Sequence, residues 1–236
     1  MMALIYRNQY EGNNLFDKVM HKLGTECEAG TAIRNRRQLM LNELKNLEKG
    51  KVLSLAAGPA QEIYDSIETG DNQLEFTALD HDIVTIKNAQ NKVQSPNLKY
   101  AICNAFDLIN GNKKILFPRA QFLPYCDPKK DFWGKRKKFL PVKYEIEELK
   151  PASYDIIYSI GLFDYLRTYP SANRGTTQLT KILFDLLKPG GKLLIGNVSH
   201  AMPLGIIWTM NCICDWYLIH RSEQEVIDFA VKFLSI

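Results

Sequence analysis

The chain has 236 residues, of which 46% are hydrophobic and 24% are charged. This composition excludes a disordered or fibrous protein, and the length suits one α/β domain with a substantial core. No apolar run reaches the roughly 18 residues that a membrane-spanning helix needs. The first residues lack the basic and apolar regions of a secretory signal. We therefore expect a cytoplasmic protein without a transmembrane segment.

Five cysteines are scattered along the chain. Cys212 and Cys214 form the one close pair, and their spacing fits neither a zinc site nor a redox motif. The four histidines are also far apart in the sequence. We therefore expect free thiols and no metal site.

Alternating strands and helices are predicted from residue 51 onward, after a helical cap over residues 1–50 that includes a helix at 31–47. Short apolar or β-branched runs predict strands that are buried on both faces, at 51–56, 74–80, 99–105, 154–160 and 192–198. Helices are predicted between them, at 61–68, 83–93 and 176–187. The sequence Lys188-Pro189-Gly190-Gly191 is expected to end the last of these. Such alternation indicates a doubly wound, mainly parallel sheet in an α/β domain over residues 51–236.

An insertion over residues 107–150 interrupts this alternation and contains a strongly basic segment. Ten basic and two acidic residues lie between Lys113 and Lys143, a net charge of +8 in a chain whose total is +4. This segment could bind an acyl carrier protein or an anionic surface, or it could be a solvated loop. Nucleic acid is a less favoured partner, because the rest of the chain is acidic on balance.

A ligand-binding loop is predicted where the first strand ends. The residues Ala56-Ala57-Gly58-Pro59-Ala60 are small enough for close approach of a ligand, and a helix N-terminus follows them. Asp80 ends the second strand 22 residues after Gly58, an offset that suits hydrogen bonds to a ribose diol. The glycine pattern of a dinucleotide site is broken by Ala60 and Ile63, and no phosphate-binding loop is present. These features favour S-adenosylmethionine (SAM), which carries no phosphate.

Several motifs in order resemble those of class I SAM-dependent methyltransferases: VLSLAAGP, Asp80, Asn104-Ala105-Phe106, SYDIIYSIGLFDYL and LLKPGGKLLIGNV. Ala56 stands where that superfamily often has glycine. More narrowly, IRNRRQ, LAAGPAQE, GLFDYL and DWYLIHR are similar to the bacterial group that includes 3-hydroxypalmitic acid methyl ester synthase. The resemblance implies a Rossmann-like fold and SAM-dependent O-methylation of a small carboxylic or fatty-acyl acceptor.

The resemblance also implies roles for individual residues. The cofactor would be bound by residues at the ends of four strands, namely Ala57, Gly58, Pro59, Asp80, Asn104, Ala105, Phe106, Ser159, Ile160 and Gly161. Asp164 and Tyr165 are the catalytic candidates, and His200 is a further candidate base. An anionic acceptor could pair with Arg34, Arg36, Arg37 or Arg221. Of the candidates for acceptor binding, we favour Arg34, Arg37, Trp216 and Arg221.

The C-terminal part departs from the family pattern. Class I methyltransferases usually close the sheet with an antiparallel hairpin, whereas the residues after 198 predict helices at 204–219 and 223–233. The hairpin is therefore expected to be short or missing, and an open edge would favour a homodimer. Two other functions remain open: an RNA or protein methyltransferase that uses the basic insertion, and a non-catalytic SAM-binding sensor or subunit.

Overall fold

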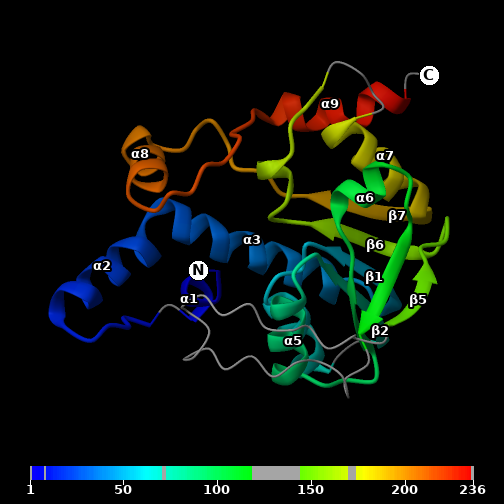
Figure 1. Ribbon diagram of the computed structural model, residues 1–236, viewed down its shortest axis with the longest axis horizontal. Coiled ribbons are helices and arrows are strands. Elements are labelled where there is room, and N and C mark those ends of the chain that lie inside the picture. Colours follow the sequence, from blue (N-terminus) through cyan, green and yellow to red (C-terminus); the bar gives the residue numbers. More distant parts are fainter. Residues whose placement is uncertain (1, 8, 71–72, 119–143, 170–173, 235–236) are drawn as a thin grey trace.

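The computed structural model describes residues 2–7, 9–70, 73–118, 144–169 and 174–234, and its centre is a seven-stranded sheet (Figure 1). The strand order is β5-β4-β3-β2-β1-β6-β7. The strands are β1 (Lys49–Leu55), β2 (Gln73–Asp80), β3 (Leu98–Ile102), β4 (Lys114–Pro118), β5 (Tyr144–Glu148), β6 (Tyr154–Ser159) and β7 (Leu187–Ile195). Strands β3, β2, β1, β6 and β7 pair in parallel with their neighbours in the sheet. Strand β4 pairs antiparallel with both β3 and β5. The predicted doubly wound α/β fold is confirmed.

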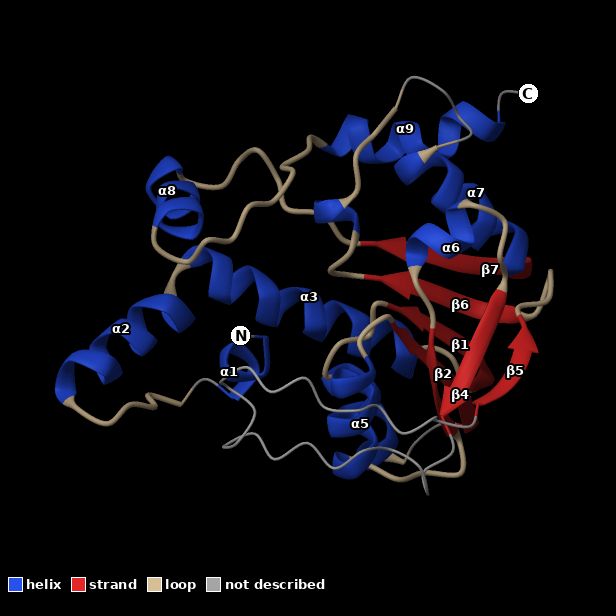
Figure 2. Ribbon diagram, in the orientation of Figure 1, coloured by secondary structure: helices blue, strands red, loops and turns tan. Residues whose placement is uncertain are grey.

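Helices cover both faces of the sheet, and Figure 2 shows α6, α7 and α9 on one side and α3 and α5 on the other. The first face carries α6 (Ala105–Ile109), α7 (Gly175–Leu186) and α9 (Glu223–Leu234). The second carries α3 (Glu28–Lys45), α4 (Gln61–Thr69) and α5 (Ile83–Lys92).

Alternate side chains of the central strands enter two separate cores. Leu53 of β1 packs with Leu183 of α7 in one core, while Val52 packs with Leu44 of α3 in the other. All four side chains are fully buried. Burial on both faces explains why these strands are continuous apolar runs in the sequence.

Helices α1 (Met2–Arg7) and α2 (Leu15–Glu26) precede α3, so the N-terminal residues are helical as predicted. Helix α2 extends away from the sheet (Figure 1). Whether residues 1–50 form a unit distinct from residues 51–236 stays a prediction. No helix in the described part of the chain is long and apolar enough to cross a membrane.

The insertion adds an antiparallel strand pair that the sequence analysis missed. Strands β4 and β5 extend the sheet beyond β3, and Lys114 lies opposite Glu148 in their register. All five residues of β5 are exposed, so this strand lacks the apolar pattern that identified the parallel strands. Most of the basic segment, residues 119–143, lies outside the described residues.

Two boundaries near the C-terminus were predicted wrongly. Strand β7 begins at Leu187, so Lys188-Pro189-Gly190-Gly191 lies within it, and a register shift between Tyr154 and Ile156 of β6 accommodates this segment. Proline disfavours helical backbone at the residue before it, so the chain becomes extended directly after α7. Helix α8 (Leu204–Cys212) also ends earlier than predicted, and Asp215 just beyond it has a φ of 47°.

The expected absence of a C-terminal hairpin agrees with the described residues, in which no strand follows β7. The antiparallel pair of this sheet is at the opposite edge, beside β3. Helices α8 and α9 follow β7 instead, and Phe229 of α9 stacks on Phe163 with the ring centroids 5.8 Å apart.

Candidate functional site

A cavity of about 1460 Å³ opens at the carboxyl ends of the parallel strands. Leu55 of β1, Asp80 of β2 and Ile195 of β7 reach it from the sheet, and Ile33 of α3 and Met210 of α8 close its sides. Strands β2 and β6 flank β1, and the helix after β1 (α4) packs on one face of the sheet while the helix after β6 (α7) packs on the other, so this is the switch point of the sheet. Ligands of open α/β sheets bind at such points.

The loop after β1 has left-handed backbone at three alternate residues: Ala56 (φ 56°), Gly58 (φ 54°) and Ala60 (φ 49°). Glycine tolerates this conformation, whereas alanine is strained in it. The turn is held by the Ala57 N–H, which donates to Leu79 O, and by the Ala60 N–H, which donates to Ala57 O, each at 2.9 Å. The loop thus presents Ala57, Gly58 and Pro59 to the cavity, where their binding of a cofactor stays a prediction.

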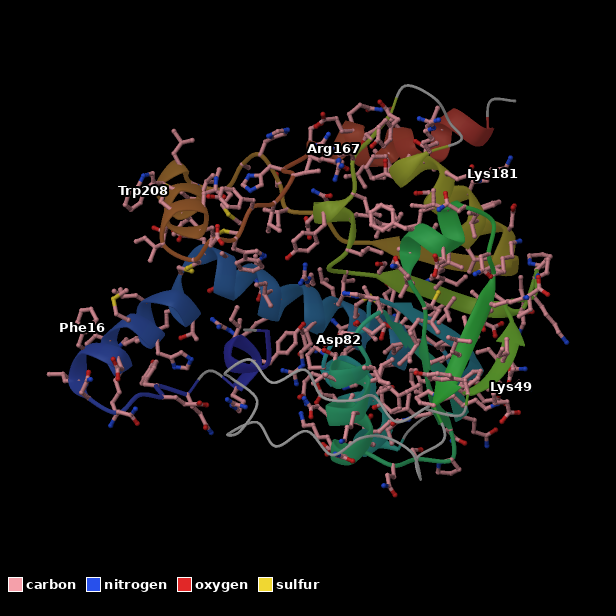
Figure 3. All side chains as sticks on the ribbon, viewed as in Figure 1. Phe16, Lys49, Asp82, Arg167, Lys181 and Trp208 are labelled. Atoms are coloured by element: carbon pink, nitrogen blue, oxygen red, sulfur yellow. The ribbon has the colours of Figure 1, made fainter. Side chains whose placement is uncertain are left out.

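Asp80 is tied to this loop and to the start of α5. Its Oδ2 accepts a hydrogen bond from the Gly58 N–H at 2.9 Å, and its Oδ1 accepts one from the Asp82 N–H at 3.0 Å. Asp82 (Figure 3) in turn caps α5 by accepting from the Val84 N–H. Because each carboxylate oxygen can accept more than one hydrogen bond, Asp80 retains capacity for a ribose diol in the cavity that it lines. The residues present therefore fit the nucleoside end of SAM.

The segment after β3 meets the cavity beside Asp80. Asn104 caps the short helix α6, with Oδ1 accepting from the Phe106 N–H at 2.9 Å. The described hydrogen bonds use only its oxygen, so the side-chain NH₂ group remains for a ligand. Phe106 is 60% exposed although it lines the cavity, and Ala105 beneath it is buried. An exposed aromatic ring at a cavity wall is a suitable stacking surface for a base.

The end of β6 differs in part from the expectation. Ile160 and Gly161 line the cavity as predicted, whereas Ser159 is fully buried and does not. The carbonyl of Ser159 accepts from the Gly196 N–H at 2.9 Å, which joins β6 to the end of β7. The Ser159 side chain thus lies outside the cavity lining, because alternation along the strand turns it into the protein interior, and a part for this residue in cofactor binding stays a prediction.

Asp164 and Tyr165 both line the cavity, in different environments. Asp164 is 3% exposed, and its Oδ1 accepts from the Val198 N–H at 2.6 Å. Burial raises the pKa of this carboxyl group, while the charges of Arg36 and Arg221 oppose that shift. Tyr165 is 52% exposed, and its hydroxyl accepts from Trp216 Nε1 at 2.6 Å. The structure thus brings Tyr165 and Trp216 together, while the predicted further base, His200, lies outside the cavity lining.

Three arginines predicted to bind substrate do not line the cavity. Arg34 donates to the Thr25 carbonyl at 2.6 Å, and Arg37 pairs with Asp65. Arg221 is buried and donates to the Phe163 carbonyl at 2.7 Å, to Asn197 Oδ1 at 2.6 Å and to the Leu166 carbonyl. The three guanidinium groups thus bind protein acceptors and do not line the cavity, so the structure does not bring them to the predicted place, and their part in substrate binding stays a prediction.

A different group of polar side chains lines the cavity wall. Its members are Arg36 of α3, Tyr6 of α1 and Glu62 of α4. Glu62 is 2% exposed and accepts from the Tyr158 hydroxyl at 3.0 Å, and burial raises the pKa of its carboxyl group. Arg36 was already among the arginine candidates. Tyr6 and Glu62 gave no separate signal in the sequence, because only the tertiary packing of α1, α3 and α4 brings them together.

Potential metal ligands do not cluster in the described part of the chain. No group of three or more potential metal ligands lies close together there. The four cysteines described, Cys27, Cys103, Cys212 and Cys214, are free thiols.

Comparison with known proteins finds likeness in structure. No protein-family model matches the chain, and no curated protein matches it. A protein of Bordetella parapertussis described as "a possible exported protein" matches with a TM-score of 0.64 and 14% identity, over 96% of this chain and 68% of that chain. A SAM-dependent methyltransferase of Mesorhizobium loti gives 0.51 and 12%, over 86% and 81%. The [4+2]-cyclase SpnF gives 0.50 and 14%, over 86% and 58%.

These matches show that the chain has the Rossmann-like fold of class I methyltransferases. At 12–14% identity the likeness concerns the fold alone. The name of SpnF describes a cyclisation, so the fold by itself does not define the reaction. The narrower resemblance to the 3-hydroxypalmitic acid methyl ester synthase group and the cytoplasmic location both stay predictions.

Proposed function

We propose that the protein is a SAM-dependent methyltransferase that acts on a small carboxylic or fatty-acyl acceptor. The observation that carries this proposal is the hydrogen bond between the Gly58 N–H and Asp80, which sets a turn of small residues and a carboxylate side by side at the cavity. Asp80 would bind the ribose hydroxyls, and Phe106 would stack on the adenine. Ile160 and Gly161 would lie beside the methionyl part.

SAM, when bound, would supply an electrophilic methyl group: the acceptor nucleophile would form a bond to the methyl carbon in line as the carbon–sulfur bond breaks and S-adenosylhomocysteine leaves. The chain's own residues would then chiefly hold the acceptor on that axis and exclude water. A carboxylate acceptor needs no general base, which agrees with an Asp164 carboxyl group that is buried and already bonded to the Val198 N–H. Tyr165 and Trp216 would position the acceptor from the opposite wall.

The walls beyond the nucleoside region favour a lipophilic acceptor. Ile33, Leu162, Met202, Met210 and Leu218 all line the cavity. Methionine side chains adapt to flexible apolar ligands such as acyl chains. Delivery by an acyl carrier protein, or an anionic surface, through the basic segment remains part of the proposal. Most of that segment lies outside the described residues.

The test is calorimetric titration of the purified protein with SAM and S-adenosylhomocysteine, with NAD as the control ligand. Binding of both S-adenosyl ligands without NAD is expected. A radiolabelled methyl transfer assay with 3-hydroxy fatty acids and their thioesters then tests the acceptor. SAM binding with no transfer to any acyl acceptor would overturn the proposed acceptor class. It would favour a non-catalytic SAM-binding sensor or subunit, or a methyltransferase that acts on RNA or protein. Absence of SAM binding by a folded protein would overturn the proposal as a whole.

A further inference from the structure

Arg36 directs its guanidinium group over the end of β6. It projects from α3 into the cavity wall, and Nη2 lies 3.6 Å from the point where a Cβ atom on Gly161 would be. Gly161 is the residue at which the proposed function places the methionyl part and the reacting methyl group. A positive charge therefore stands beside the reactive end of the cavity rather than in solvent.

The Nε–H group of Arg36 is buried and has no hydrogen-bond partner among the described residues. Within the same residues, no ion pair within 4.0 Å includes Arg36. Its neighbours Arg34 and Arg37 differ, since each binds a protein oxygen. A buried charged donor without an acceptor is costly, so a ligand oxygen at this position would remove an existing penalty.

The Tyr6 side chain lies beside the Arg36 guanidinium group on the cavity wall. The Arg36 guanidinium group interacts with the Tyr6 hydroxyl and partly opposes the effect of burial, which raises the pKa of Tyr6 to about 12, so the phenol keeps its proton at neutral pH. The ring is held from the other side by Arg37, whose Cζ lies 5.4 Å from the ring centroid. The Tyr6 proton is thus available to a second oxygen of the same ligand.

The acidic groups that face Arg36 are already engaged. Glu62 accepts from Tyr158, and Asp164 accepts from the Val198 N–H. Burial raises the pKa of both carboxyl groups while the charge of Arg36 opposes that shift, and among the described residues neither carboxyl group forms an ion pair with Arg36 within 4.0 Å. The charge at this wall is therefore left for an anion from the cavity.

We propose that Arg36 and the Tyr6 hydroxyl form a carboxylate-binding subsite next to Gly161. A guanidinium group and a phenol together match the two oxygens of a carboxylate. The identity of the ligand rests on the proposed function, which brings two carboxylates to this end of the cavity. One is the amino-acid end of an S-adenosyl ligand, and the other is the carboxylate of the acceptor.

The variants Arg36→Gln and Arg36→Lys test the subsite, with Arg167→Gln as the matched control. Arg167 is exposed and lies outside the cavity lining (Figure 3). Tyr6→Phe is a milder second variant that retains the ring on Arg37. Melting curves confirm that each variant is folded. Calorimetry then compares S-adenosylhomocysteine with 5′-methylthioadenosine, which lacks the amino-acid carboxylate.

If the cofactor supplies the carboxylate, Arg36→Gln weakens S-adenosylhomocysteine binding about tenfold or more while methylthioadenosine binding is unchanged. If the acceptor supplies it, neither nucleoside is affected, and octanoate binding to the protein saturated with S-adenosylhomocysteine is lost. Arg36→Lys keeps part of the affinity in either case. Unchanged binding of all three ligands in Arg36→Gln would overturn the subsite.

A nuclear magnetic resonance titration separates this proposal from the proposed function. The Arg36 Nε–H resonance is assigned by its loss in Arg36→Gln, and octanoate is added without any nucleoside, with octanol as the uncharged control. A shift with octanoate alone supports the subsite even if no S-adenosyl ligand binds. No shift with octanoate, together with unchanged S-adenosylhomocysteine binding in Arg36→Gln, overturns the subsite while leaving the methyltransferase proposal in place.

Discussion

The backbone N–H of Gly58 donates to the carboxylate of Asp80 at 2.9 Å, across 22 residues of sequence. This bond joins the turn after β1 to the end of β2 and fixes the relative position of a left-handed loop and a carboxylate. The same carboxylate accepts from the Asp82 N–H, so Asp80 is both part of the candidate binding site and a support of the loop.

Because of this double role, we expect Asp80→Ala to lower both ligand affinity and stability. The Gly58 and Asp82 N–H groups lose their acceptors, at a cost of about 1–3 kcal/mol in the free energy of unfolding. Asp80→Asn keeps an acceptor oxygen, so it should lose S-adenosylhomocysteine affinity with a smaller loss of stability. Urea denaturation and calorimetry measure the two effects, with the exposed Glu75→Ala on the same strand as control. Unchanged affinity in Asp80→Asn would contradict the ribose assignment.

Ala56→Gly is expected to leave the free energy of unfolding unchanged or to raise it by up to about 1 kcal/mol. Relief of left-handed strain at a φ of 56° offsets the greater chain entropy of glycine in the unfolded state. Ala230→Gly within α9 is the matched control, and it should lose about 1 kcal/mol as alanine-to-glycine changes in helices do. Equal losses in the two variants, measured by urea denaturation, would show that Ala56 is not strained.

Glu62→Gln should stabilise the protein increasingly as pH rises. Burial raises the pKa of Glu62 in the folded state above its ordinary value of 4.5, so the folded protein binds the proton more tightly than the unfolded chain does. The protonated carboxyl group of Glu62 therefore stabilises the folded wild-type protein below pH 4.5, and this contribution to the free energy of unfolding is lost as pH rises toward the raised pKa. Glutamine keeps an acceptor for the Tyr158 hydroxyl without the charge.

The measurement for Glu62→Gln is the difference in unfolding free energy between variant and wild type at pH 5 and at pH 8. The difference should be larger at pH 8. The exposed Glu75→Gln variant should show no such trend, because its carboxyl group is in solvent in both states. A difference for Glu62→Gln that does not vary with pH would mean that its pKa is the same in the folded and unfolded chains.

Tyr165 and Trp216 should be coupled in acceptor binding, since the indole Nε1 donates to the Tyr165 hydroxyl at 2.6 Å. Tyr165→Phe and Trp216→Phe are expected to raise the KM for the acceptor while leaving S-adenosylhomocysteine affinity unchanged. The double variant should lose less than the sum of the single effects, with a coupling of about 0.5–1.5 kcal/mol. Additive effects would indicate that the two side chains act independently.

Arg221→Lys should destabilise the fold by about 3 kcal/mol or more without a specific effect on ligand binding. Lysine cannot reach Asn197 and the carbonyls of Phe163 and Leu166 with the planar donors of a guanidinium group. Urea denaturation measures the loss, and calorimetry at low temperature measures the affinity of the folded fraction. Loss of acceptor affinity with unchanged stability would restore the substrate-binding role predicted from sequence.

The parallel strands and the part of the cavity at the ends of β1 and β2 could be predicted from the sequence because both depend on local patterns. Leu53 and Val52 belong to a continuous apolar run, and such a run is typical of a strand that is buried on both faces. Gly58 and Asp80 lie at the carboxyl ends of neighbouring parallel strands, and such ends always meet at one edge of a sheet. Strand β5 could not be found in this way, since its exposed residues carry no apolar pattern.

The polar wall of the cavity was decided by tertiary structure alone. The sequence offers Arg34, Arg36, Arg37 and Arg221 as partners for an anion, and the prediction from sequence favours the three that the structure places outside the cavity lining. Only the packing of the helices determines that Arg37 meets Asp65, that Arg221 is buried among carbonyl groups, and that Arg36 reaches Gly161 without a protein acceptor at Nε. The sequence by itself thus determined the parallel strands and the position of the loop after β1, through hydrophobic periodicity and strand-end geometry. The long-range contacts of polar side chains follow no such period, so only the tertiary structure determined which arginine lines the cavity.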